Sequence, residues 1–148
     1  MHMFESFDIN ASGLTAQRYR LDVISENIAN VDTTRTQDGT PYRRKSVIFA
    51  EKGNGHSFAS ALDKAKGTYQ AGGVKVVSTF EDTSTDLKMV YDPAHPDADE
   101  NGYVSYPNVD VVTEMTNLID ATRAYEANAT AFTASKNMAV KGLEMAQG

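Results

Sequence analysis

Residues 24–36 read ISENIANVDTTRT, and this stretch marks where the first third of the chain changes from helix to extended chain. Asn30 predicts the end of a helix, because asparagine tolerates the left-handed backbone conformation that often terminates one. The β-branched threonines after it favour an extended chain. Upstream, seam residues recur every seven positions, which predicts a helix over roughly residues 6–31. They form two series, which are Phe7, Leu14, Leu21, Ile28 and Asn10, Gln17, Ile24, Val31.

A second seam runs from Asn108 towards the end of the sequence. Its positions alternate in steps of four and three over about five heptads, as in a long amphipathic helix. Asn108 or Asp110 is the expected N-cap of this helix, and Ser6 or Asp8 that of the first, because a short side-chain oxygen accepts from free amides of a first turn. The second seam consists of Val111, Met115, Leu118, Thr122, Tyr125, Ala129, Phe132, Lys136, Ala139 and Leu143.

The middle of the chain has the texture of short strands separated by turns. The spacer DTST, residues 82–85, suggests a hairpin between the second and third strands, and a helical turn is possible at residues 58–66. The residues 92–102 read as a loop with two prolines and an Asn-Gly pair. The expected strands are residues 42–49, 74–80, 87–91 and 103–106.

These patterns predict an α+β fold in which long N- and C-terminal helices form a coiled-coil-like domain beside a small β-rich middle domain. Residues 1–36 and 107–148 would form the helical domain, and residues 37–106 the middle one. The 148 residues suffice for one domain of ordinary size or two small ones.

Composition excludes several classes of function. The chain has no cysteine, so disulfides, thiol nucleophiles and Cys-ligated metals are excluded. A formal net charge of −6, with basic residues dispersed apart from Arg43, Arg44 and Lys45, makes nucleic acid an unfavourable partner. No apolar run approaches the ~18 residues of a membrane span, and no secretory signal is visible at the N-terminus.

The sequence offers no catalytic motif and predicts no enzyme, cofactor or metal site. Neither a G-x-S-x-G elbow, a P-loop nor an H-E-x-x-H is present. Residues 97–102, DADENG, match the first half of an EF-hand loop. The twelfth position, which requires a bidentate glutamate, is Asn108, and Pro96 stands where the entering helix should be. An acidic turn in which Asx side chains bond their own backbone is the favoured interpretation.

The two apolar seams have three possible uses. Each helix packs on its own core, the seams pair with each other, or they meet other subunits. Apolar residues off the seams favour partners, because a helix pair buries one face of each helix and the middle segment is poor in large apolar residues. These off-seam residues are Phe4, Ile9, Tyr19, Val23, Val112, Ile119, Met138 and Met145.

Four stretches resemble one known family. ENIANVDTTRT resembles the N-terminal signature of the flagellar axial proteins of the rod, hook and hook–filament junction, an amphipathic helix ending in N-I-A-N followed by Thr. The stretches PYRRKSVIF, YDPAHPDADENGYVSYPNVDVVTEM and RAYEANATAF are similar to proximal rod subunits of that family. The resemblance covers nearly the whole chain and is weakest at residues 50–72. The serine that commonly precedes the motif is Glu26 here.

The resemblance implies a structural subunit of the bacterial flagellar basal body, in the periplasm-spanning rod that transmits motor torque. It also implies that the terminal helices form a coiled-coil-like inner, axial domain and that the β-rich middle of the chain forms an outer domain. Its implied partners are other rod subunits and further copies of itself in a helical assembly, and the flagellar type III apparatus, which exports such subunits without a cleaved signal. Together with the seams, it predicts a subunit interface made of Leu14, Leu21, Ile24, Asn27, Ile28, Asn30, Val111, Met115, Leu118, Tyr125, Phe132 and Leu143. The alternative function is a soluble helical-hairpin adaptor or export-chaperone-like binding module.

Overall fold

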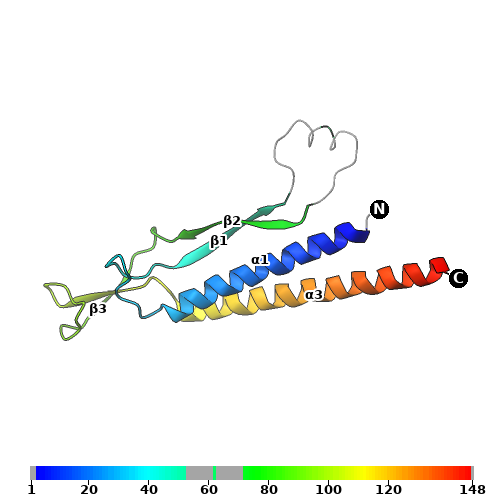
Figure 1. Ribbon diagram of the computed structural model, residues 1–148. Coiled ribbons are helices and arrows are strands. Elements are labelled where there is room, and N and C mark those ends of the chain that lie inside the picture. The colour runs from blue at the N-terminus through cyan, green and yellow to red at the C-terminus, as the bar shows by residue number, and fades with distance from the viewer. Residues whose placement is uncertain (1–2, 53–61, 63–71, 148) are drawn as a thin grey trace. The chain divides into compact units, whose positions relative to one another are not determined.

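The computed structural model describes residues 3–52, 62 and 72–147 and confirms the α+β class (Figure 1). Two long helices enclose the strands in chain order, and the expected helical turn at 58–66 falls, apart from Leu62, outside the described residues. The elements are α1 (Met3–Ala29), β1 (Lys45–Glu51), β2 (Val74–Glu81), β3 (Lys88–Tyr91), β4 (Tyr103–Tyr106) and α3 (Val111–Gln147).

Helix α1 ends close to where the sequence predicts, but a side-chain hydrogen bond ends it and not a left-handed residue. The side-chain amide of Asn30 donates to the carbonyl of Glu26 at 2.9 Å and so satisfies a carbonyl of the last turn. No described residue other than glycine has a positive φ, so the expected left-handed Asn30 is wrong. The expected caps Ser6 and Asp8 are also wrong, because the helix already begins at Met3 and both lie inside it.

Helix α3 begins with an aspartate cap. Asp110 Oδ2 accepts from the amide of Thr113 at 3.3 Å and from its hydroxyl at 2.6 Å. The hydroxyl bond is the main reason that the pKa of Asp110 is lowered. Of the two expected caps, Asp110 is therefore confirmed. Asn108 instead bonds the backbone of other segments.

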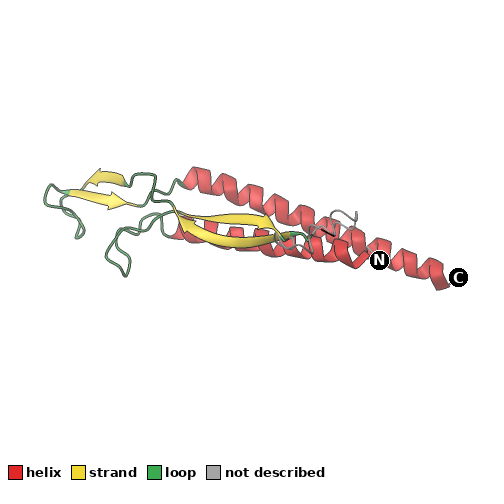
Figure 2. Cartoon of the chain, turned by 90° about the horizontal axis from the view of Figure 1, so that it is seen from above, coloured by secondary structure: helices red, strands yellow, loops and turns green. Residues whose placement is uncertain are grey.

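The strands form two separate two-stranded sheets, β1–β2 and β3–β4, which Figure 2 shows in yellow. The expected hairpin between residues 74–80 and 87–91 is therefore wrong. Asp82 explains why, because its carboxylate accepts from the amides and hydroxyls of Ser84 and Thr85 in a local turn that ends β2. The same four bonds hold the pKa of Asp82 well below its usual range, with the hydroxyl of Ser84 contributing most.

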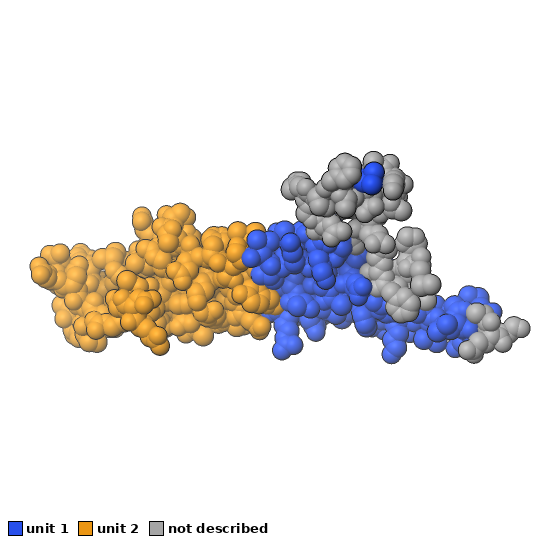
Figure 3. Space-filling view, turned by 45° about the horizontal axis from the view of Figure 1, so that its top comes forward, with its two compact units in different colours: residues 1–18, 49–77, 122–148 blue, residues 19–48, 78–121 orange. Residues whose placement is uncertain are grey.

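The chain divides into two compact units, coloured in Figure 3, and each contains a piece of both helices. Unit 1 comprises residues 1–18, 49–77 and 122–148, and unit 2 comprises residues 19–48 and 78–121. Each unit is described by itself below.

In unit 1, α1 and α3 run antiparallel (Figure 1). Phe7 meets Phe132 edge-to-face, with ring centroids 5.1 Å apart. A Cβ on Gly13 would lie 2.7 Å from Asn128 Oδ1, so glycine allows the side chain of the other helix to come close. The seam pairing that the sequence left open thus occurs at Phe7 and Phe132.

In the same unit, Gly73 allows the start of β2 to lie close against α1. Its φ is +84°, a conformation that favours glycine, and an added Cβ would lie within van der Waals overlap of Ser12 Oγ. That hydroxyl accepts from the amide of Val74 at 3.0 Å and donates to the carbonyl of Ile9 at 2.7 Å. A side chain at Gly73 would therefore displace the bond that joins strand to helix.

We expect Gly73→Ala to lower the free energy of unfolding by about 2 kcal/mol or more, from backbone strain and from the clash with Ser12. Gly39→Ala is the matched control, because Gly39 has a φ of +77° with no atom within 4 Å of an added Cβ. Urea unfolding of both variants separates strain from clash. Equal losses would show that contact with Ser12 contributes nothing.

Candidate assembly interface and its supporting polar cluster

The structure distributes the twelve predicted interface residues over three environments. Ile24 and Asn27 are buried within the chain itself. Leu14, Leu21, Ile28, Asn30, Leu118 and Phe132 are half-buried, and Val111, Met115, Tyr125 and Leu143 are exposed. A role in contacts between subunits stays a prediction for all twelve.

Helix α3 turns a row of large apolar side chains to solvent. In unit 2 the row consists of Val112, Met115 and Ile119, spaced three and four residues apart on one helix face. We call these three residues the α3 outer face. Met115 is 54% exposed and Ile119 is 53% exposed. Unit 1 adds the exposed residues Met138, Val140, Leu143 and Met145.

The inward side of α3 uses different residues from those expected. Leu118 and Phe132, both in the expected seam, are half-buried. A second series, at steps of seven residues, is polar or small. Glu114, Ala121 and Ser135 of this series are buried, and Asn128 is half-buried. The expected seam members Met115, Thr122, Lys136 and Leu143 are instead exposed, so the seam lies about one position away from the predicted one at these steps. The off-seam Val23, expected to be uncovered, is also buried.

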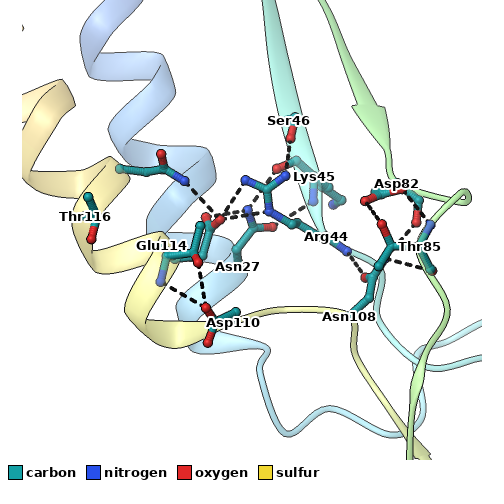
Figure 4. Close-up of polar contacts among 12 residues, drawn as sticks. Asn27, Arg44, Lys45, Ser46, Asp82, Thr85, Asn108, Asp110, Glu114 and Thr116 are labelled. Atoms are coloured by element: carbon teal, nitrogen blue, oxygen red, sulfur yellow. Dashed lines mark hydrogen bonds and ion pairs between the residues drawn. The ribbon is translucent and has the colours of Figure 1, made fainter.

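A buried polar cluster in unit 2 holds α1, β1 and α3 together (Figure 4). Asn27 is fully buried, and its amide pairs with the backbone of Lys45 in both directions: Nδ2 donates to the carbonyl and Oδ1 accepts from the amide, each at 2.8 Å. Nδ2 also donates to Glu114 Oε2 at 3.0 Å, and the hydroxyl of Tyr42 donates to Oδ1 at 2.9 Å. The amide of Asn27 therefore connects three elements of the fold.

Glu114 carries the charge of this cluster. It is 1% exposed, and its Oε1 accepts from both Nε and Nη2 of Arg44 at 2.8 Å. Arg44 also donates through Nη1 to Ser46 Oγ at 3.0 Å, so each nitrogen of its guanidinium has a partner. A buried carboxylate is tolerated only when paired and hydrogen-bonded, and Glu114 has both kinds of partner.

Asn108 joins the cluster to the turn after β2. Its Oδ1 accepts from the amide of Arg44 at 2.9 Å, and its Nδ2 donates to the carbonyls of Asp82 at 2.9 Å and Thr85 at 3.3 Å (Figure 4). The sequence offered Asn108 as a possible cap of the second helix, and it gave no sign that Asn27 binds other segments of the same chain. Both instead serve tertiary contacts, which no local pattern signals.

Tyr42 is protected from ionisation by its place in the cluster. Burial, and then the negative charges of Glu26, Glu81 and Glu114, raise the pKa of its phenol. The raised pKa means that the folded chain favours neutral Tyr42. This stabilisation is complete below the unfolded pKa of about 10 and is lost as the pH rises from there towards the folded pKa.

We expect Tyr42 to keep its proton at about pH 11 in the folded chain. The measurement is the tyrosinate absorbance of the chain and of Tyr42→Phe over an alkaline titration. The two curves should differ by one phenolate only where circular dichroism shows unfolding. A difference that develops in the folded chain near pH 10 would contradict the burial argument.

The acidic loop 92–102 is held by hydrogen bonds to its own backbone and by contacts with the segment that follows α1. Asp99 Oδ1 accepts from the amides of Asn101 and Tyr103, as in the Asx turn that the sequence favoured. Asp97 forms an ion pair with Arg35 at 2.5 Å and accepts from the hydroxyl of Thr34 at 2.7 Å. These bonds tie the threonine-rich segment after α1 to the loop.

Among residues 3–52, 62 and 72–147, no group of three histidine or acidic side chains is placed to hold a metal ion. Neither helix carries a stretch apolar enough to span a bilayer.

Comparison with known proteins places this architecture in a family. Residues 7–36 match the family described as flagella basal body rod protein, and residues 100–145 match the family described as flagellar basal body rod FlgEFG protein C-terminal. The chain is 50% identical to the flagellar basal-body rod protein FlgC of Bacillus subtilis, over 98% of this chain and 99% of that protein. It is 48% identical to the FlgC protein of Borreliella burgdorferi over the full length of both chains.

A more distant relative agrees. The FlgC protein of Salmonella typhimurium is 43% identical over 99% of this chain and all of that protein. The two family matches cover most of α1 and α3, and the relatives extend the similarity through the strands between them. The chain therefore belongs to the FlgC family of flagellar basal-body rod proteins.

Proposed function

We propose that this chain is a structural subunit of the flagellar basal-body rod and that its α3 outer face contacts neighbouring subunits. The observation that carries the proposal is the distribution of apolar side chains along α3. Small and polar residues fill much of the inward side, while Val112, Met115 and Ile119 point to solvent. A contiguous exposed apolar face of this kind is typical of a surface that a partner covers.

The full-length similarity to rod proteins supports this function over the adaptor or chaperone-like module. In this proposal the neighbours are other rod subunits and further copies of the chain, stacked so that torque passes through packed helices. The terminal segments 1–36 and 107–148 form the inner, helical domain of that stack, and residues 37–106 form the outer one. The chain reaches the rod through the flagellar export apparatus without a cleaved signal, and it catalyses no reaction.

The experiment that tests the interface is photo-crosslinking in the flagellated source cells. A benzophenone amino acid at Met115 should give crosslinks to flagellar rod subunits, because that side chain is exposed in the single chain and covered in the assembly. The same amino acid at Asp38, in an exposed turn of unit 2, is the matched control and should give fewer. Crosslinks from Met115 only to proteins outside the flagellum, or none, would contradict the proposal.

A further inference from the structure

The β3–β4 hairpin exposes one of its two faces more fully than the other. Its register pairs Met89 with Ser105 and Tyr91 with Tyr103, and these four side chains share one face because side chains alternate along a strand. We call this set the open hairpin face. The pairs between them, Lys88 with Tyr106 and Val90 with Val104, point to the opposite face.

The opposite face is covered in part by the fold of unit 2, although Val90 on this face is 46% exposed. Val104 is fully buried, and the ring of Tyr106 lies 6.3 Å from that of His95 in the loop. Lys88 turns its amino group to the carbonyl of Val109 at 2.7 Å. Lys88, the only lysine of the two strands, therefore binds a backbone carbonyl and places no positive charge on the open hairpin face.

The open hairpin face is apolar and held in shape. Tyr91 is 65% exposed, Met89 56% and Tyr103 43%. The two tyrosine rings meet edge-to-face at 5.3 Å, and the hydroxyl of Ser105 donates to the sulfur of Met89 at 3.2 Å. Gly102, with a φ of +80°, leaves room for the ring of Tyr91, which a Cβ would approach to 3.0 Å. The aromatic pair is thus preorganised, which lowers the entropic cost of covering it.

The segment that forms the hairpin is rich in acidic residues. Residues 86–106 carry five acidic side chains and one lysine, a formal charge of −4, and Arg35 neutralises one of the five by pairing with Asp97. Glu100 is exposed in the loop that joins the strands. Exposed aromatic rings on a hairpin of net negative charge favour a cation flanked by apolar surface.

We propose that the open hairpin face binds a segment of a different polypeptide that carries lysine or arginine next to a large apolar side chain. A second copy of the hairpin is a poor occupant, because two acidic loops would meet, and the whole chain carries a net charge of −6. The location of this partner, beside an assembled rod, rests on the proposed function. The contact itself is separate from the α3 outer face.

The test places the benzophenone amino acid at Tyr91 in the flagellated source cells, with the Met115 probe as a reference. We expect a Tyr91 crosslink to a peptide of another protein with a basic residue within a few positions of the linked site. Glu100→Lys should lower the yield of this crosslink at least about fivefold and leave the Met115 crosslink unchanged. Asp38→Lys, the same charge change in another exposed turn of unit 2, is the control and should leave both unchanged.

The outcomes separate the two proposals. If Met115 crosslinks to rod subunits while Tyr91 crosslinks to nothing, to an acidic segment or to another copy of this chain, the hairpin proposal is wrong and the rod function stands. A Tyr91 yield that Glu100→Lys does not change would also overturn the hairpin proposal. If Met115 crosslinks to no flagellar protein, the proposed function itself fails.

Discussion

Replacement of Glu114 by alanine is expected to lower the free energy of unfolding by at least about 3 kcal/mol. The substitution removes Oε1, which accepts from both Nε and Nη2 of Arg44, and Oε2, which accepts from the buried Asn27. Removing one member of a buried ion pair leaves the other charge without compensation, which costs more than the pair contributes. Urea unfolding, followed by circular dichroism, measures the loss.

Two further variants make this result interpretable. Asp120→Ala removes an exposed carboxylate from the same helix and should change stability by no more than about 0.5 kcal/mol. Glu114→Gln keeps the shape and one acceptor, so its loss should lie between the two. If Glu114→Ala and Asp120→Ala lose equal stability, the cluster does not hold α1, β1 and α3 together as argued.

The double substitution Met115→Asp and Ile119→Asp is expected to abolish motility while the isolated chain keeps its stability to within about 1 kcal/mol. Both side chains are more than half exposed, so the single chain loses little packing. An interface core that must exclude water cannot accommodate two unpaired carboxylates. Swimming in soft agar and urea unfolding of the purified chain give the two readouts.

The conservative pair Met115→Leu and Ile119→Leu is the control and should remain motile, because shape and polarity are nearly kept. Leu118→Asp provides a contrast. Leu118 is half-buried, so this variant should lose stability together with motility. Swimming cells that carry the double aspartate variant would exclude the α3 outer face from the assembly interface.

The sequence predicted both long helices, but it predicted only some of the residues on their inward faces. Heptad spacing found Leu118 and Phe132, since large apolar residues at regular steps are what a pattern search detects. The pattern search missed Glu114, Ala121 and Ser135, because none of them is a large apolar residue. Glu114 is buried because it pairs with Arg44, 70 residues away in the sequence. Spacing alone therefore assigned exposed Met115 to a place that Glu114 occupies.

The strands show the same limit at the level of pairing. Their positions follow from Val, Thr and Tyr content, and each observed strand overlaps its prediction. Which strands pair depends on the turns between them. The spacer at 82–85 looks like a hairpin by composition, yet Asp82 uses its carboxylate to close a local turn, and Asn108 and Arg43 bind the carbonyl of the same residue from distant parts of unit 2.

The pair of hydrogen bonds between Asn27 and the backbone of Lys45 has a consequence for the edge of the β1–β2 sheet. An amide side chain that donates to one backbone carbonyl and accepts from the same residue's N–H imitates a neighbouring strand. The first residue of β1 therefore offers no free backbone groups on its outer edge, where an unpaired strand would template aggregation. In a chain proposed to assemble with other subunits, this asparagine occupies one backbone N–H and one C=O at which a wrong strand pairing could begin.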